Sequence, residues 1–356
     1  MSAEGLDLDK YEHILLCQSA MGPLRERLIA RGWSIREVGF PTSKWDPRWF
    51  LRALKATSDL DPDIIHGAVS EGNILASMLS LRFSRAKVVK EETSDGTGRR
   101  LAGRLIAKMM YSRSDAVIAV SPAVEHYLLK ELKVKPSRIR LLMNGVERPR
   151  SFTDQQIAEF REELGIADST LVLGTVGRLQ DSHKGQSKLL TALPELLKEF
   201  DDLVLVIVGE GPDLAHLRQI SNRLGIETSV VFAGYRGKAE PFYRIMDVFV
   251  LASTMEAFGL VVAEAMLSRV PVIASAVGGI PYILDGGNCG ALVSPCDSVG
   301  LGRAIARLLR DLPSARVTAE KAYERAVSNF VSDRYVGDLE RLWAELLKED
   351  SRVGSF

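Results

Sequence analysis

Short apolar runs alternate with amphipathic segments along almost the whole chain. Runs such as 203–208 and 247–252 are rich in β-branched residues, which is typical of strands buried on both faces. The segments between these runs place apolar residues three to four positions apart and therefore predict helices. Strands that alternate with helices form mostly parallel sheets covered by helices on both sides. We therefore expect an α/β protein with doubly wound sheets.

The pattern divides the chain into two halves. In the first half the expected strands are 13–18, 34–38, 64–66, 87–90, 116–120 and 139–142, and the expected helices are 23–30, 47–56, 73–81, 98–111 and 122–132. In the second half the expected strands are 171–176, 203–208, 230–233, 247–252, 272–275 and 291–293. The helices expected there are 186–199, 213–224, 238–245, 259–268, 298–310, 314–329 and 333–349. A polar connection, 147–154, separates the halves, so we predict domains of residues 1–148 and 149–334, with a final helix in 335–356 crossing back onto the first.

Two glutamates stand out in the apolar stretch 246–281. Glu256 follows an expected strand, and Glu264 lies inside the next expected helix. In open parallel sheets, ligands bind beyond the carboxyl ends of the strands, where helix N-termini present N–H groups. Three such groups could hold a diphosphate: those of Phe258, Gly259 and Leu260. Glu264 would lie ~9 Å further along the helix, so a carboxylate would stand on either side of the phosphates, unless both glutamates simply face solvent.

Other candidates follow other strands of the second half. Arg178 and Lys184 come after 171–176, and two cations there can neutralise a diphosphate. Gly209 would allow close approach of the backbone, and Tyr235 is either a base-contacting residue or an ordinary surface aromatic. Neither a GxGxxG dinucleotide fingerprint nor a GxxxxGK[ST] phosphate loop occurs at these positions.

Composition narrows the class of protein. The 356 residues are 46% hydrophobic and 26% charged, which suits two α/β domains. No apolar run approaches the ~18 residues of a membrane span, and the first residues lack the regions of a signal peptide. Three cysteines, Cys17, Cys289 and Cys296, have no metal-ligand spacing. We therefore expect a reduced, cytoplasmic protein without a metal site.

Charge is unevenly distributed. Residues 1–150 hold 25 Lys and Arg against 18 Asp and Glu, a net charge of +7, and the remainder carries −7. Within the basic half, the segment Gly98–Arg113 predicts a basic amphipathic helix. Its apolar stripe comprises Leu101, Leu105, Ile106, Met109 and Met110, and its basic residues off the stripe are Arg99, Arg100, Arg104 and Lys108. Such a helix either buries its stripe in the domain core or lies on an anionic membrane surface, and both interpretations stay open.

Taken together, the motifs of the second half resemble the retaining GT-B glycosyltransferases of family 4, which use nucleotide sugars. The matching segments are Asn144-Gly145-Val146, Gly177-Arg178-Leu179 with Lys184-Gly185, Val208-Gly209-Glu210-Gly211-Pro212, Glu256 through Glu264, Gly278-Gly279-Ile280-Pro281 and Gly290-Ala291-Leu292-Val293. The first half resembles the family only in its strand–helix rhythm, in Gly22 and in Asp63-Ile64-Ile65-His66. The resemblance implies two Rossmann-like domains, an acceptor-binding one and a donor-binding one, with the active-site cleft between them.

The resemblance also implies roles for individual residues. Glu256 would bind hydroxyls of the donor sugar, Glu264 the ribose diol, and Arg178 with Lys184 the diphosphate. The residues around Tyr235 would meet the base, and Gly22 would belong to the donor site. The chain departs from the family where many relatives carry a histidine and this sequence, after a strand ending at Lys90, has Glu92. That carboxylate could still orient or polarise an acceptor hydroxyl, unless it is an exposed loop residue.

With this resemblance, the sequence leads us to expect a retaining, metal-independent hexosyltransferase that uses no cofactor. It would transfer a hexosyl or N-acetylhexosaminyl group from a nucleoside diphosphate sugar, with UDP-sugar favoured, to a glycan or lipid-linked acceptor of surface polysaccharide or glycoconjugate synthesis. It would act in the cytoplasm, or on the inner face of the cytoplasmic membrane if the basic helix docks there. Two alternatives stay open: a sugar-nucleotide-binding module without turnover, and a dinucleotide-dependent oxidoreductase, which the missing fingerprint disfavours.

Overall fold

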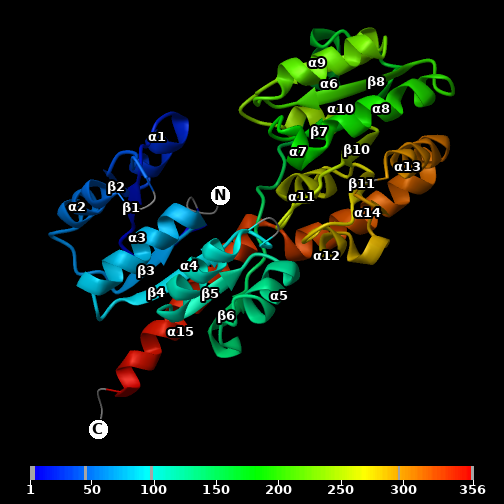
Figure 1. The fold of residues 1–356 in the computed structure, drawn as a ribbon. Helices are drawn as coiled ribbons and strands as arrows, with labels where there is room; N and C mark the ends of the chain where they lie inside the picture. The colour runs from blue at the N-terminus through cyan, green and yellow to red at the C-terminus, as the bar shows by residue number, and fades with distance from the viewer. Residues whose placement is uncertain (1–4, 44–45, 97–98, 296, 354–356) are drawn as a thin grey trace. The chain divides into compact units, whose positions relative to one another are not determined.

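The computed structural model describes residues 5–43, 46–96, 99–295 and 297–353. Gly98 and Cys296, which the sequence analysis considered, lie outside these ranges. The chain forms two compact units (Figure 1): the first comprises Met1–Gly145 with Ser332–Phe356, and the second comprises Val146–Val331.

The first unit contains two parallel sheets. β1 (Ile14–Cys17) pairs with β2 (Ser34–Glu37), and a second sheet has the order β3-β4-β5-β6. The strands of that sheet are β3 (Ile64–Gly67), β4 (Lys87–Glu92), β5 (Ala116–Ala119) and β6 (Ile139–Leu141). The helices that precede residue 146 are α1 (Pro23–Ala30), α2 (Pro47–Ala56), α3 (Val69–Arg82), α4 (Leu101–Ser112) and α5 (Pro122–Lys130).

The C-terminal helix α15 (Ser332–Val353) completes the core of the first unit, as the sequence predicts. Its buried residues Tyr335, Leu339, Leu342 and Trp343 pack against Val89, Ala116 and Ile118 of β4 and β5. The Tyr335 hydroxyl also donates a hydrogen bond to the Glu91 carboxylate, and His66 Nε2 lies 3.4 Å from the same carboxylate. Burial would raise the pKa of Glu91, but these two partners hold it below its ordinary value.

The second unit has one six-stranded parallel sheet of order β12-β11-β10-β7-β8-β9. Its strands are β7 (Leu171–Val176), β8 (Leu203–Val208), β9 (Val230–Gly234), β10 (Val248–Leu251), β11 (Val272–Ser275) and β12 (Ala291–Val293). Its longer helices are α6 (Asp154–Glu163), α8 (Gln186–Leu197), α9 (Leu214–Arg223), α11 (Leu260–Leu267), α13 (Ser298–Arg310) and α14 (Leu312–Asn329). Three short helices, α7 (Asp181–Lys184), α10 (Glu240–Ile245) and α12 (Ile280–Ile283), lie in connections, and the leucine-rich core packs α8, α9 and α13 on the sheet.

Buried Lys90 fixes the end of α4 to the sheet of the first unit. Its side chain is fully buried, and its Nζ donates a 2.5 Å hydrogen bond to the backbone oxygen of Met110. Burial, together with repulsion from Arg113, lowers the pKa of Lys90 from 10.5 to about 8. The ammonium is thus destabilised in the folded protein relative to the unfolded chain.

This lysine gives the first prediction. Between the two pKa values the unfolded chain keeps the proton and the folded protein has lost it, so rising pH stabilises the folded state. From about pH 7 to about pH 9.5 the gain should be about 2 kcal/mol. Lys90→Met has no titrating group at this position and so lacks the gain. The free energy of unfolding of the variant, measured with urea, should therefore fall relative to that of wild type by the same amount as the pH rises over this range. Parallel pH profiles of the two proteins would contradict the assignment.

Candidate active site

The strand order of the second unit defines where a ligand can bind. From β7 the chain builds outward through β8 and β9, and from β10 it builds outward in the opposite direction through β11 and β12. The order therefore reverses between the neighbouring strands β7 and β10. In open parallel sheets the ligand crevice lies at this switch point, beyond the carboxyl ends of the two strands.

Two residues predicted from the sequence meet at this point. Lys184 ends α7 in the connection after β7, and Glu256 lies in the loop after β10. Their side chains form an ion pair, and Glu256 also accepts a 3.0 Å hydrogen bond from the Ser253 hydroxyl. The backbone N–H of Thr254 donates to the oxygen of His183 at 2.9 Å, so the two loops are joined by the backbone as well. The switch point therefore brings a cation and a carboxylate into direct contact.

Arg178 lies directly after β7 with an exposed side chain. Within the described part of the chain its guanidinium forms no ion pair or hydrogen bond, so it is available to a ligand. The adjoining loop after β8 is held close by Gly209, whose φ is 130°. A Cβ atom at this position would lie 2.0 Å from the backbone oxygen of Gly177, so only glycine allows the two loops to approach.

The N-terminus of α11 is a candidate binding site for an anion. Gly259 precedes the helix with φ 110°, and a Cβ there would lie 2.3 Å from Cδ1 of Ile280. Among the described residues, no protein acceptor takes the backbone N–H of Phe258, Gly259 or Leu260. Free N–H groups and the positive end of the helix dipole attract a phosphate group.

Glu264 lies in the second turn of α11 and is oriented by a tyrosine. The Tyr243 hydroxyl donates a 2.8 Å hydrogen bond to its carboxylate. Burial raises the pKa of Glu264 above its ordinary value, and the negative charges of Glu240 and Glu147 act in the same direction against the hydrogen bond from Tyr243. A carboxylate that is held in place but only partly paired is suited to bind hydroxyl groups.

Tyr235 follows a strand and Gly22 lies in the connection from β1 to α1, but neither has a contact that defines a function. Tyr235 follows β9 with a side chain that is 71% exposed, and its backbone N–H is 3.4 Å from a carboxylate oxygen of Glu210. Gly22 precedes α1 in the first unit with φ 80°. Their roles stay predictions.

The expectation for Glu92 is partly wrong. The strand does not end at Lys90 but continues as β4 through Glu92, which is buried rather than an exposed loop residue. Its carboxylate accepts hydrogen bonds from Arg99 at 2.8 Å, from the Tyr111 hydroxyl at 3.1 Å and from the backbone of Ser94 at 3.0 Å. These partners stabilise the carboxylate where the sequence alone offers none. Glu92 therefore anchors the segment that leads into α4.

The matches to known families now decide the class of protein. Residues 156–325 match the family model "Glycosyl transferases group 1", and residues 2–150 match "Glycosyltransferase Family 4". The chain is 32% identical over 328 residues to the alpha-monoglucosyldiacylglycerol synthase of Streptococcus pneumoniae, covering 85% of this chain and 72% of that protein. The chain belongs to glycosyltransferase family 4.

Other relatives of this glycosyltransferase are consistent with that assignment. It is 28% identical over 302 residues to the N-acetyl-alpha-D-glucosaminyl L-malate synthase of Bacillus anthracis, which covers 81% of the chain and 76% of the relative. It is 33% identical to the D-inositol 3-phosphate glycosyltransferase of Corynebacterium jeikeium over 238 residues, which is 64% of this chain and only 57% of that protein.

Solved structures confirm the GT-B fold of this glycosyltransferase. Anabaena HepE in complex with UDP and glucose matches with a TM-score of 0.82 at 20% identity, covering 94% of this chain and 100% of that one. Sucrose-phosphate synthase from Thermosynechococcus elongatus matches with a TM-score of 0.78 at 22% identity, covering 95% and 100% of the two chains. Two parallel-sheet α/β domains are thus established, as the sequence predicts.

Sequence reasoning missed the residues that support the two glutamates of this glycosyltransferase. Tyr243 and Ser253 are both buried, and each donates its hydroxyl to one carboxylate. The sequence offered a weak signal for Ser253, because it is a polar residue directly after an apolar strand. Tyr243 had none, because 21 residues separate it from Glu264. No helix within the described ranges is long and apolar enough to cross a membrane.

Proposed function

We propose that this glycosyltransferase transfers a hexosyl or N-acetylhexosaminyl group from a nucleoside diphosphate sugar, most readily a UDP-sugar, and that the anomeric configuration is retained. The observation that carries the proposal is the contact of Lys184 with Glu256 at the switch point of the second unit. The cation can bind a phosphate of such a donor, and the carboxylate beside it can bind hydroxyls of the sugar attached to that phosphate. UDP in the similar HepE structure supports the same donor class.

The donor would bind along the residues already described. Lys184, Arg178 and the free N–H groups before α11 would hold the diphosphate. Glu256 would accept hydrogen bonds from sugar hydroxyls on one side of it. Glu264, one turn into α11, would accept those of the ribose diol on the other side.

The proposed reaction takes place on one face of the sugar. The bond from the anomeric carbon to the phosphate oxygen breaks, the acceptor oxygen bonds to the same carbon, and the leaving phosphate takes the acceptor's proton. Negative charge develops on the leaving diphosphate, so Lys184, Arg178 and the end of α11 stabilise the transition state more than the ground state. The proposal requires no metal ion. Glu92 is assigned the role of a positioning residue because its carboxylate is fully engaged.

For the acceptor we propose a glycan or a lipid-linked molecule in the assembly of a surface polysaccharide or glycoconjugate. The relative in Streptococcus pneumoniae is a synthase of a glucosylated diacylglycerol, which favours the lipid-linked option. The basic first half of the chain favours an acceptor or a surface that is anionic. We place the reaction at the cytoplasmic face of an anionic membrane.

A donor screen tests the proposal. Thermal stability and sugar release should be measured with UDP-, GDP- and ADP-sugars, and with NAD as a comparison. We expect stabilisation and slow hydrolysis with one class of sugar nucleotide, UDP-sugars foremost, no response to NAD, and release of a sugar whose initial configuration by NMR is that of the donor. Binding without any turnover would support a non-catalytic module, and no response to any sugar nucleotide would contradict the proposal.

A further inference from the structure

The outer side of α4 exposes three large apolar side chains on successive turns. Leu101, Leu105 and Met109 are 73%, 62% and 62% exposed and lie four residues apart, which places them in one row along the helix. The helix packs inward through Ala107 and Tyr111, which are buried. The interpretation of the stripe as domain core is therefore wrong for these three residues. A row of exposed apolar side chains marks a surface that contacts another body.

The charges that α4 itself carries beside this row are of one sign. All charged residues of segment 99–113 are basic: Arg99, Arg100, Arg104, Lys108 and Arg113. Three of them, Arg100, Lys108 and Arg113, are exposed and form no ion pair with any residue that the structure describes. A helix with an apolar row and only basic charged residues is complementary to an anionic amphiphile, and the apolar row argues against a nucleic acid.

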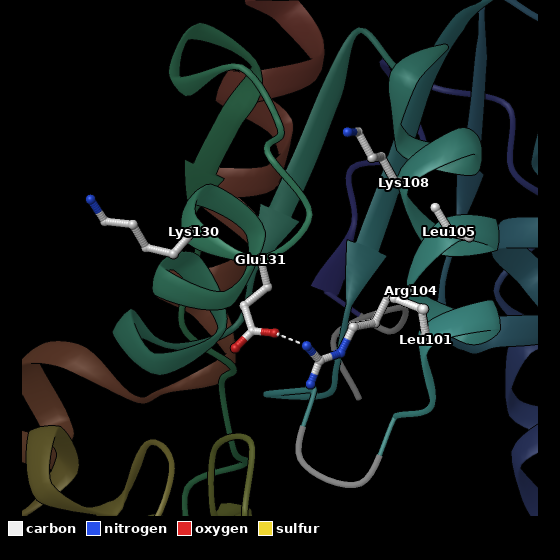
Figure 2. A pocket seen from close by; sticks show the side chains of 6 residues that line it. All are labelled: Leu101, Arg104, Leu105, Lys108, Lys130 and Glu131. Atoms are coloured by element: carbon white, nitrogen blue, oxygen red, sulfur yellow. Dashed lines mark ion pairs between the residues drawn. The ribbon is translucent and has the colours of Figure 1, made fainter.

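A groove of about 560 Å³ separates α4 from the end of α5. Its walls are formed by Leu101, Arg104, Leu105, Lys108, Lys130 and Glu131 (Figure 2). Arg104 reaches across the groove to Glu131 at 2.5 Å, so this pair is neutral overall. Lys108 projects from the same helix on the groove side, whereas Lys130 extends away from α4. The net positive charge of the groove therefore rests on the two lysines, with Lys108 nearer its interior.

We propose that α4 docks the protein on a bilayer of anionic phospholipids. Leu101, Leu105 and Met109 insert between the headgroups, and the groove seats one headgroup phosphate at Lys108. The bound lipid is a docking partner and not a substrate. The inference rests on the proposed function only in that a lipid-linked acceptor would lie in the same bilayer.

The test is sedimentation of the full-length protein with vesicles of phosphatidylcholine, with and without phosphatidylglycerol. Wild type should sediment with the anionic vesicles and much less with the neutral ones. Binding should weaken as salt rises, because the Debye length falls from ~10 Å at 0.1 M to ~3 Å at 1 M. Equal binding to both kinds of vesicle, or no binding to either, would overturn the proposal.

Two sets of variants separate insertion from the phosphate seat. The triple change Leu101→Ser, Leu105→Ser and Met109→Ser should lower partitioning about 100-fold or more. Arg100→Gln and Lys108→Gln each remove one charge from the same helix. A cation near an anionic surface contributes about fivefold to partitioning, so Arg100→Gln should lose up to about that factor. Lys108→Gln should lose about 25-fold, because it also loses a charge-assisted hydrogen bond.

Matched controls use exposed residues of the second unit. Val299→Ser and Val317→Ser replace side chains that are 63% and 62% exposed, and they should leave vesicle binding unchanged. Equal losses for Arg100→Gln and Lys108→Gln would overturn the phosphate seat, and an unaffected serine triple variant would overturn insertion. A dimer in solution that the serine variant abolishes, without any vesicle binding, would assign the row to a second copy of the chain instead.

UDP affinity, measured by calorimetry in every variant, separates this inference from the proposed function. The α4 variants should bind UDP as wild type does, because the proposed donor site lies in the second unit. Vesicle binding without UDP binding would leave the docking inference intact and contradict the donor assignment. UDP binding and turnover without vesicle binding would leave the donor assignment intact and contradict the docking inference.

Discussion

Lys184→Ala and Arg178→Ala are each expected to lower kcat/KM by about 10² or more, the effect of removing one preorganised donor from a developing negative charge. Arg178 is exposed and Lys184 is partly exposed, so the folded protein should lose little stability in either variant. Steady-state kinetics on the donor identified by the screen gives the ratio, and circular dichroism with thermal unfolding reports the fold.

The two substitutions differ in what they leave behind. Among the residues that the structure describes, Lys184→Ala leaves Glu256 with only the Ser253 hydroxyl as a side-chain donor, whereas Arg178→Ala disturbs no side-chain contact. Lys198→Ala is a suitable control, because its side chain is 70% exposed and its ammonium pairs with Glu195 elsewhere on the second unit. Near-wild-type turnover in both Arg178→Ala and Lys184→Ala would refute the diphosphate assignment.

Glu264→Gln and Glu256→Gln are expected to fail in different steps. The first should weaken the binding of UDP about tenfold, because a hydrogen bond to a charged acceptor is worth about 1.5–3 kcal/mol and only part of it is lost. The second should leave UDP affinity within about twofold and lower turnover of the intact donor by about 10². Calorimetry with UDP and steady-state kinetics with the UDP-sugar distinguish the two effects.

The pH dependence of UDP binding checks the same assignment. Because the pKa of Glu264 is raised, its carboxylate takes up a proton at a higher pH than an ordinary glutamate does as the solution is acidified. A protonated carboxyl loses acceptor capacity for the ribose hydroxyls, so the affinity for UDP should decrease as the pH is lowered through that range. Glu264→Gln should show a flatter profile. Equal loss of UDP affinity in both glutamine variants would show that the proposed order of sugar, phosphate and ribose is wrong.

The strands of the second unit were predictable because their burial is visible locally. β7, β8, β11 and β12 have the bounds expected from continuous apolar runs. α6 was not predicted, because Asp154–Glu163 has almost no apolar period. The capping box formed by Thr153 and Gln156 was a signal that could have identified its start.

The candidate site was predictable where its residues lie in loops that directly follow strands. It was unpredictable where a residue's burial depends on contacts with residues far away in the sequence. The meeting of Lys184 with Glu256 follows from parallel strands that end at one edge of the sheet. The burial of Glu92 does not follow from its polar neighbours, because Arg99 and Tyr111 stabilise it only once α4 has packed. The exposure of Leu101 and Leu105 was equally hidden, since periodicity defines the faces of a helix but not which face packs.

The most direct test of the central claim is a crystal structure of the protein with UDP bound. The account predicts that the diphosphate lies at the switch point of the second unit, within hydrogen-bond distance of Lys184, Arg178 and the N–H groups before α11. It also predicts that the ribose hydroxyls donate to Glu264. UDP bound elsewhere, or a diphosphate without contact to Lys184 and the N-terminus of α11, would contradict it.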